Sequence, residues 1–282
     1  MPLSQKSLET GSGAKAYQEF RQYLERVCGI ELGANKAYLV SSRLSEIVRQ
    51  QNMTSLQALV DRLKLGRDLT LQKLIVDAMT TNETQWFRDG YPFEKLKKML
   101  EPSLAKNTIS PLRIWSAACS SGQEPYSIAM VLSELKASWP ALNRPIQIVA
   151  TDISDQMLGI AKKGVYNTLA IRRGLPVARL NRFFKEVDNG HMEISADVRK
   201  MVSFERKNLL DSFVSMGQFD LIFCRNVLIY FTPENKADII RRMAAQIKPN
   251  GYFVPGSSES LTDFDDMLTM QNLVPGIVYQ KK

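Results

Sequence analysis

Hydrophobic residues recur with helical spacing over the first part of the chain. Apolar side chains lie three or four positions apart in four successive stretches between residues 14 and 78, as at Phe20, Leu24 and Val27. Glycines and the turn-forming run 52–54 separate these stretches. The pattern predicts a bundle of about four helices, and we assign residues 1–78 to an all-α domain.

The pattern changes after residue 112 to short apolar runs that alternate with helical segments. Five runs predict strands, at residues 112–118, 146–151, 201–205, 219–224 and 251–255. Helices are predicted at 127–135 and 233–247. Strand, helix and strand in repetition predict an α/β domain over residues 79–282, with a mostly parallel sheet that binds its ligand beyond the carboxyl ends of the strands.

About fifty residues between the second and third predicted strands depart from this alternation. The turn sequence Asp188-Asn-Gly190 lies between two alternating segments and predicts an antiparallel hairpin. We interpret residues 164–200 as a small β-subdomain inserted into the sheet domain. Residues 162–207 hold 11 basic and 5 acidic side chains. A solvated basic face and a docking surface for an acidic partner both account for this charge.

Net charge and the small number of histidines and cysteines limit the partners and reactions that the chain can support. With 37 basic and 29 acidic residues the formal charge is +8, which indicates an acidic partner, a nucleic acid or an anionic cofactor. One histidine, His191, and three separated cysteines, Cys28, Cys119 and Cys224, do not form a zinc cluster, so we expect no metal and a reaction that needs no strong base. The sequence contains no signal-peptide or membrane-span pattern, so we expect a cytoplasmic protein without membrane insertion.

Two polar motifs follow the first two strands of the predicted sheet. Gly122 and Pro125, in the loop 116–127, indicate either a close approach of an anionic ligand group to the backbone at the start of a helix or an ordinary tight turn from strand to helix. Asp152 ends the second strand, where a carboxylate can accept the ribose hydroxyls of a nucleoside or cap the next helix.

Three further segments carry candidate ligand contacts. Arg225 and Asn226 directly follow an apolar strand, where burying them without partners would be costly, so a ligand role is favoured. Asn208 follows the strand 201–205 and offers an amide beside apolar surface, which suits an adenine ring. The polar and aromatic run 80–88 is either an ordinary linker or, as we prefer, a lid over a cofactor.

Taken together and in order, these motifs resemble those of chemotaxis receptor methyltransferases. This family uses S-adenosylmethionine to methylate glutamate side chains on the cytoplasmic helices of chemoreceptors. The resemblance rests on Thr81-Asn-Glu-Thr84 with Phe87-Arg88, on the segments 115–127 and 150–153, and on Phe223-Cys-Arg-Asn-Val-Leu-Ile-Tyr-Phe231. It covers nearly the whole chain and implies a Rossmann-like methyltransferase sheet preceded by the helical domain, with a linker at 79–100.

The resemblance also implies the roles of individual residues. Glu124 and Asp152 would bind the amino and ribose groups of S-adenosylmethionine, and Arg88 and Tyr230 would act at the reacting end as catalytic residues. The implied cofactor contacts are Asn82, Thr84, Arg88, Glu124, Asp152, Asn208, Leu209, Arg225 and Asn226. Gln123 stands where many relatives carry a second acid. The product would be S-adenosylhomocysteine.

The implied substrate suits a chain with one histidine, because a glutamate carboxylate of reference pKa about 4.3 is ionised at neutral pH and needs no general base. Lys36, Arg43 and Arg49 would form a basic stripe that docks on the acidic helical bundle of a receptor, although a solvated face explains them as well. The short turn at 188–190 favours independence from a receptor tail peptide. We expect a monomer recruited to receptor arrays.

Two other functions remain open from the sequence. A nucleic-acid methyltransferase would agree with the charge of +8, but the Asn or Asp followed by Pro-Pro and an aromatic that base methylation commonly uses is absent at 225–228. A non-catalytic adaptor would bind S-adenosylmethionine as a signal without turning it over.

Overall fold

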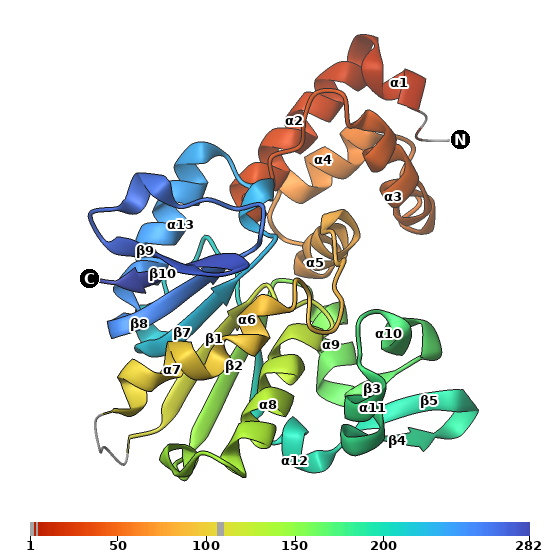
Figure 1. Ribbon diagram of the computed structural model, residues 1–282. Helices are drawn as coiled ribbons and strands as arrows, with labels where there is room; N and C mark the ends of the chain where they lie inside the picture. The colour runs from red at the N-terminus through yellow and green to blue at the C-terminus, as the bar shows by residue number, and fades with distance from the viewer. Residues whose placement is uncertain (1–2, 4, 106–109) are drawn as a thin grey trace.

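The computed structural model describes residues 3, 5–105 and 110–282. Its first part is an all-α lobe, coloured red to orange in Figure 1. The helices of this lobe are α1 (Gln5–Glu9), α2 (Gly11–Cys28), α3 (Ala37–Gln50), α4 (Leu56–Lys64) and α5 (Leu69–Met79). The four predicted helices correspond to α2 to α5, and the short α1 precedes them.

The helical lobe has a hydrophobic core of its own. The core comes from the positions with helical spacing, and Phe20, Leu44 and Leu59 are fully buried in it. Ser55 and Asp68 open α4 and α5, where each side chain accepts a backbone N–H three residues further on. These caps fix where the two helices begin.

The second part is a mixed sheet with the strand order β6-β2-β1-β7-β8-β10-β9. The strands are β1 (Leu112–Ala117), β2 (Ile146–Asp152), β6 (Val202–Arg206), β7 (Phe219–Cys224), β8 (Ile247–Pro255), β9 (Leu268–Leu273) and β10 (Gly276–Lys281). β6, β2, β1, β7 and β8 run parallel, as predicted, whereas β10 and β9 are antiparallel and were not predicted.

Helices cover both faces of this sheet. α6 (Tyr91–Glu94), α7 (Leu96–Leu104) and α8 (Gln123–Lys136) lie on one face, and α13 (Pro233–Ala245) lies on the other. Successive residues of β1 face opposite ways, so that Ile114 packs with α7 and α8 and Trp115 packs with α13. α9 (Asp155–Lys163) contacts β2 and β6. Short 3-10 turns occur at Pro140–Leu142, Val214–Met216, Leu228–Tyr230 and Thr262–Phe264.

The strand order places a crevice beside β1. The chain passes from β1 outward to β2 and β6, then crosses to β7 on the other side of β1. In open sheets of this kind ligands bind at such a switch point, beyond the carboxyl ends of the strands. The helical lobe lies close to this region, and Ile30 and Phe231 form a β-bridge between lobe and sheet domain.

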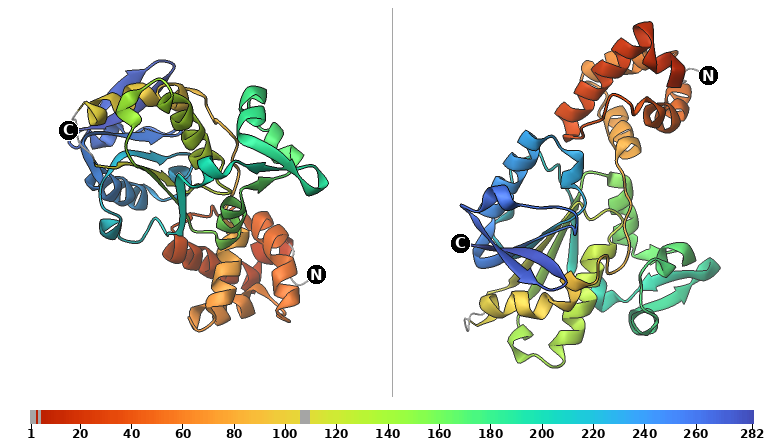
Figure 2. Two further views of the ribbon diagram at one scale, coloured as in Figure 1. Left: turned by 90° about the horizontal axis from the view of Figure 1, so that it is seen from below. Right: turned by 45° about the horizontal axis from the view of Figure 1, so that its top comes forward.

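The predicted β-subdomain is present as a three-stranded antiparallel sheet of order β3-β5-β4. It contains β3 (Val165–Tyr166), α10 (Thr168–Arg172), α11 (Val177–Phe183), β4 (Phe184–Val187), β5 (His191–Ile194) and α12 (Ala196–Arg199). The hairpin turn is a 3-10 turn at Asp188–Gly190. The subdomain projects from one side of the main sheet in both views of Figure 2.

Three predicted boundaries are wrong by two residues or more. α8 begins at Gln123 rather than at residue 127, because Gly122 turns the chain straight into the helix with a φ of +92°. The predicted helix 233–247 ends at Ala245, and β8 begins at Ile247 instead of residue 251.

Within the described ranges, no helix combines the length and hydropathy needed to span a bilayer.

Candidate active site

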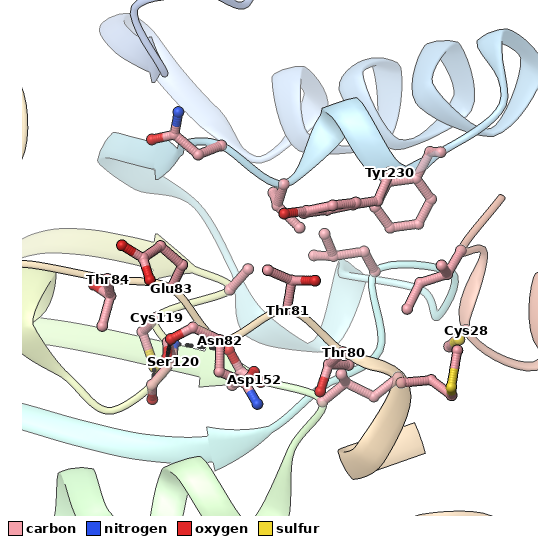
Figure 3. Close-up of a pocket in the computed structure, with 18 of the residues that line it drawn as sticks. Cys28, Thr80, Thr81, Asn82, Glu83, Thr84, Cys119, Ser120, Asp152 and Tyr230 are labelled. Carbon is pink, nitrogen blue, oxygen red and sulfur yellow. Dashed lines mark hydrogen bonds between the residues drawn. The ribbon is translucent and has the colours of Figure 1, made fainter. Parts of the chain in front are cut away.

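A cavity of about 370 Å³ opens at the carboxyl ends of β1, β2 and β7. The linker at 79–88 and the helical lobe supply the rest of its wall. Tyr230 lies across the cavity from Ser120 and Asp152, and Thr81 of the linker lies between them (Figure 3). The cavity brings together Lys36, Arg43, Asn82, Thr84, Arg88, Glu124, Asp152, Asn208, Leu209, Arg225, Asn226 and Tyr230 from the predicted set. Arg49 does not line it.

The loop after β1 is built for close approach. Ala118, Ser120 and Gly122 have φ values of +55°, +49° and +92°, so the loop turns back on itself within a few residues. A Cβ on Gly122 would lie 2.9 Å from the Cβ of Ala161, which leaves no room for a side chain. This tight packing holds the loop against α9.

Asp152 ties this loop to the end of β2. Its Oδ2 accepts the N–H of Ser120 at 2.8 Å, and its Oδ1 accepts the N–H of Ser154 at 2.9 Å. Burial raises the pKa of the Asp152 carboxyl, and these backbone hydrogen bonds oppose the rise. Ser120 Oγ in turn donates to the carbonyl of Asn82 at 2.9 Å, which fastens the linker to the loop.

Glu124 and Arg225 form the charged part of the pocket. Glu124 Oε1 accepts from Ser116 Oγ at 2.7 Å, and Oε2 accepts from Arg225 Nη1 at 3.1 Å. The Arg225 side chain is only 2% exposed, and its Nη2 donates to the Arg88 carbonyl and to Asp89 Oδ2 at 2.7 Å. Arg225 therefore joins the β7 tip, α8 and the linker.

Glu259, which sequence reasoning did not single out, organises the end of β7. Its carboxylate accepts the backbone N–H of Asn226 at 2.7 Å, of Gly256 at 2.8 Å and of Leu228 at 3.0 Å. These bonds hold Asn226 at a φ of +57°. The resemblance of the sequence to the methyltransferase family extends to the segment Gly256-Ser-Ser-Glu-Ser260, and this was the only sequence signal for Glu259.

Two buried polar atoms of residues that line the pocket have no hydrogen-bond partner in the described part of the chain. Arg225 Nε and Asn226 Oδ1 are buried without a hydrogen-bond partner among the residues that the structure describes. One is a donor and the other an acceptor. The carboxylates of Glu124 and Asp152 line the same cavity, and as acceptors they suit the ammonium and the ribose hydroxyls of S-adenosylmethionine, the implied cofactor.

The linker crosses the site and is fastened on its far side by Trp86. The indole is 1% exposed, and its Nε1 donates to the carbonyl of Ala170 at 3.1 Å. The Trp86 N–H donates to the Arg173 carbonyl at 3.0 Å, and the ring packs edge-on against Tyr166 and Phe184. The inserted subdomain therefore holds the linker that walls the pocket.

The helical lobe contacts the sheet domain beside the reacting end. The N–H of Glu31 donates to the Tyr230 carbonyl at 2.7 Å, and Asn208 Nδ2 donates to the Val27 carbonyl at 2.7 Å. From α3, Arg43 Nη1 donates to the Met79 carbonyl at 2.8 Å. Asn208 and Arg43 thus line the pocket while they also join parts of the chain.

The three cysteines are buried thiols and poorly suited to act as nucleophiles. Burial raises the pKa of Cys28 to about 11 and those of Cys119 and Cys224 well above the ordinary value. All three thiols are free and buried, as interpreted from the sequence. Over the described part of the chain, no three His, Cys, Asp or Glu residues cluster with metal-binding geometry.

Comparison with known proteins identifies the family. The all-alpha domain of the CheR methyltransferases matches residues 15–80, and their SAM-binding domain matches residues 82–276. Chemotaxis protein methyltransferase 1 of Pseudomonas aeruginosa is 50% identical over 94% of this chain and 97% of its own. A chemotaxis protein methyltransferase of Vibrio parahaemolyticus is 48% identical over 94% of this chain and 96% of its own.

Solved structures are more distant. The N-methyltransferase NodS of Bradyrhizobium japonicum, in complex with S-adenosyl-L-homocysteine, has a TM-score of 0.39 and 16% identity, and covers 74% of this chain and 97% of its own. The two domain matches and the identity of about half the residues lead to one conclusion: the chain belongs to the CheR family of chemotaxis methyltransferases, which depend on S-adenosylmethionine.

Proposed function

We propose that this methyltransferase modifies glutamate side chains on the cytoplasmic helices of chemoreceptors, forming glutamate methyl esters and S-adenosylhomocysteine. The observation that carries the proposal is one pocket that gathers Glu124, Asp152 and Tyr230 beside the linker bearing Arg88. Relatives named as chemotaxis protein methyltransferases support a substrate within chemotaxis.

The pocket residues divide between the two ends of the cofactor. Glu124 would accept from the amino group and Asp152 from the ribose hydroxyls, because both carboxylates line the cavity and retain free lone pairs. The amide of Asn208 and the side chain of Leu209 would flank the adenine. Asn82, Thr84, Arg225 and Asn226 would complete the wall. When bound, S-adenosylmethionine supplies an electrophilic methyl group.

The substrate carboxylate needs orientation rather than deprotonation. Glutamate has a reference pKa of about 4.3, so its side chain arrives ionised at neutral pH. Arg88 and Tyr230 would orient it, and the linker would exclude water. Proximity and alignment can supply roughly 7–11 kcal/mol in such reactions. His191 lies on β5 of the inserted subdomain, outside the residues that line the pocket, which agrees with a reaction that uses no histidine base.

The basic residues of α3 and its N-cap are proposed to dock the acidic receptor bundle. Lys36 and Arg43 line the pocket mouth, whereas Arg49 lies further along the helix and pairs with Glu46. We therefore propose that Lys36 and Arg43 contribute more to receptor docking than Arg49 does. We also propose a helical docking domain at 1–78, a catalytic domain at 79–282, a cytoplasmic monomer and no need for a receptor tail peptide.

The decisive experiment uses labelled S-adenosylmethionine, cytoplasmic fragments of candidate chemoreceptors and peptide mapping. The proposal expects base-labile methyl esters on glutamate. Cofactor binding without turnover on any fragment would favour the adaptor function. Label in RNA or DNA, with salt-sensitive binding, would favour a nucleic-acid methyltransferase.

A further inference from the structure

Arg225 lies between two carboxylates, and only one of them lines the cofactor pocket. Glu124 lines the pocket. Asp89 directly follows Arg88, the last linker residue that lines the pocket, and does not line it itself. The ion-pair contact to Asp89, at 2.7 Å, is shorter than the one to Glu124, at 3.1 Å. Asp89 is therefore the closer partner of this guanidinium.

The charges of this cluster do not balance. One guanidinium faces two carboxylates in a place where the Arg225 side chain is 2% exposed and the Glu124 side chain 13% exposed. Charges interact more strongly at such partly buried positions than in water. Because Asp89 already neutralises Arg225, Glu124 keeps negative charge that it can offer to a ligand cation.

The backbone holds Asp89 for this contact. Phe87 and Asp89 both have positive φ values, +50° and +66°, which non-glycine residues seldom adopt. Such conformations persist where surrounding contacts maintain them. Here Arg225 Nη2 binds both the Asp89 carboxylate and the Arg88 carbonyl, so one guanidinium group fixes this turn.

We propose that Asp89 is a positioning residue for the amino-acid end of S-adenosylmethionine. It acts through Arg225, which it orients and neutralises, so that the Glu124 carboxylate stays available to the cofactor's ammonium group. The inference rests on the proposed role of Glu124 and adds a residue outside the pocket to the recognition of the cofactor.

The test compares two ligands that differ in the amino-acid end. S-adenosylhomocysteine carries the ammonium group, whereas 5′-methylthioadenosine keeps the nucleoside and thioether but lacks it. We expect Asp89→Asn to weaken S-adenosylhomocysteine binding about tenfold, equivalent to about 1.4 kcal/mol, and to leave 5′-methylthioadenosine affinity unchanged. Isothermal titration calorimetry on the full chain measures both constants.

Three variants make the result specific. Glu94→Gln, which removes an exposed carboxylate from the neighbouring α6, should leave both affinities unchanged. Asp89→Glu should restore part of the S-adenosylhomocysteine affinity, because it keeps the charge. Asp89→Asn combined with Glu124→Gln should weaken binding no further than Glu124→Gln alone, since both substitutions act on one interaction.

If Asp89→Asn lost equal affinity for the two ligands, Asp89 would have a structural role only and the proposal would be overturned. Unchanged S-adenosylhomocysteine affinity would also overturn it. Melting of the ligand-free variants checks folding, and Asp89→Glu carries the same comparison if Asp89→Asn fails to fold. Binding by the wild-type chain without methylation of any receptor would contradict the proposed substrate and leave this test intact.

Discussion

At the scale of single residues, the pocket sets the properties of its carboxylates through burial and backbone contacts. Asp152 is 7% exposed, and burial raises the pKa of its carboxyl despite two backbone N–H donors. The ionised form is the better acceptor for ribose hydroxyls. Cofactor affinity should therefore be sensitive to pH above the range where an ordinary aspartate titrates.

We predict that S-adenosylhomocysteine affinity falls on acidification. Protonation of Asp152 removes the acceptor, and because its pKa in the free protein is raised, the loss begins at higher pH than for an unshifted aspartate. Calorimetry over a descending pH series measures the effect. Asp152→Asn should bind more weakly at neutral pH and should lack this part of the pH dependence. An identical pH profile for the variant would assign the dependence to another group.

Glu259 gives a second prediction at this scale. Glu259→Gln keeps the shape but offers one carbonyl oxygen to three backbone donors, so we expect a loss of about 1–3 kcal/mol in the free energy of unfolding. Cofactor affinity should fall as well, because Asn226 loses its anchor. Urea denaturation and calorimetry measure the two effects. Glu205→Gln, on exposed β6 surface, is the matched control. Unchanged stability would refute the anchoring role.

At the scale of elements, sequence patterns predicted the five parallel strands and missed the antiparallel pair β9 and β10. β1 and β7 are apolar runs because both of their faces are covered, and their order along the chain indicated the parallel sheet. β9 has the sequence LTMQNL with only its end residues buried, so neither a continuous run nor strict alternation marked it. Its partner β10 was missed with it.

In the site, sequence motifs identified the residues that line the pocket but not the residues that hold them in place. Glu124 and Asp152 were found because they belong to motifs at strand ends. Asp89 and Glu259 were not found, because each acts through a residue that is distant in sequence. Asp89 binds Arg225, which lies 136 residues later in the chain, and Glu259 binds the backbone of Asn226, which lies 33 residues earlier. Such pairs are created by the fold, and local spacing carries no sign of them.

The contact between the linker and the inserted subdomain leads to a prediction about elements. A Cβ on Gly174 would lie 2.3 Å from the carbonyl oxygen of Trp86, so Gly174→Ala should push the linker away from the subdomain. We expect cofactor affinity to fall several-fold, because the linker that includes Asn82 and Arg88 walls the pocket. Gly190→Ala is the matched control, since it has a similar positive φ, +69° against +91°, with nothing within 4 Å of the new Cβ. Equal effects would show that backbone strain alone is responsible.

At the scale of the whole molecule, two lobes complete one pocket. The helical lobe reaches the site through Glu31 and the α2 terminus, and α3 and its N-cap bring Lys36 and Arg43 to the mouth. A docked receptor would therefore touch the lobe that borders the cofactor. The formal charge of +8 attracts an acidic partner from any direction, but only basic residues at the mouth would hold it in register for methyl transfer.

This distinction between net charge and position can be tested by charge reversal. Lys36→Glu and Lys98→Glu change the net charge equally, but Lys36 borders the pocket, whereas Lys98 is exposed on α7 and does not line the pocket. We expect Lys36→Glu to weaken binding of a chemoreceptor cytoplasmic fragment several-fold, with a smaller effect on S-adenosylhomocysteine, and Lys98→Glu to change fragment binding little. The fragment affinity of the wild type should fall with added salt, and Lys36→Glu should flatten that dependence. If both reversals weakened fragment binding equally, overall charge rather than a docking surface on α3 would account for recruitment.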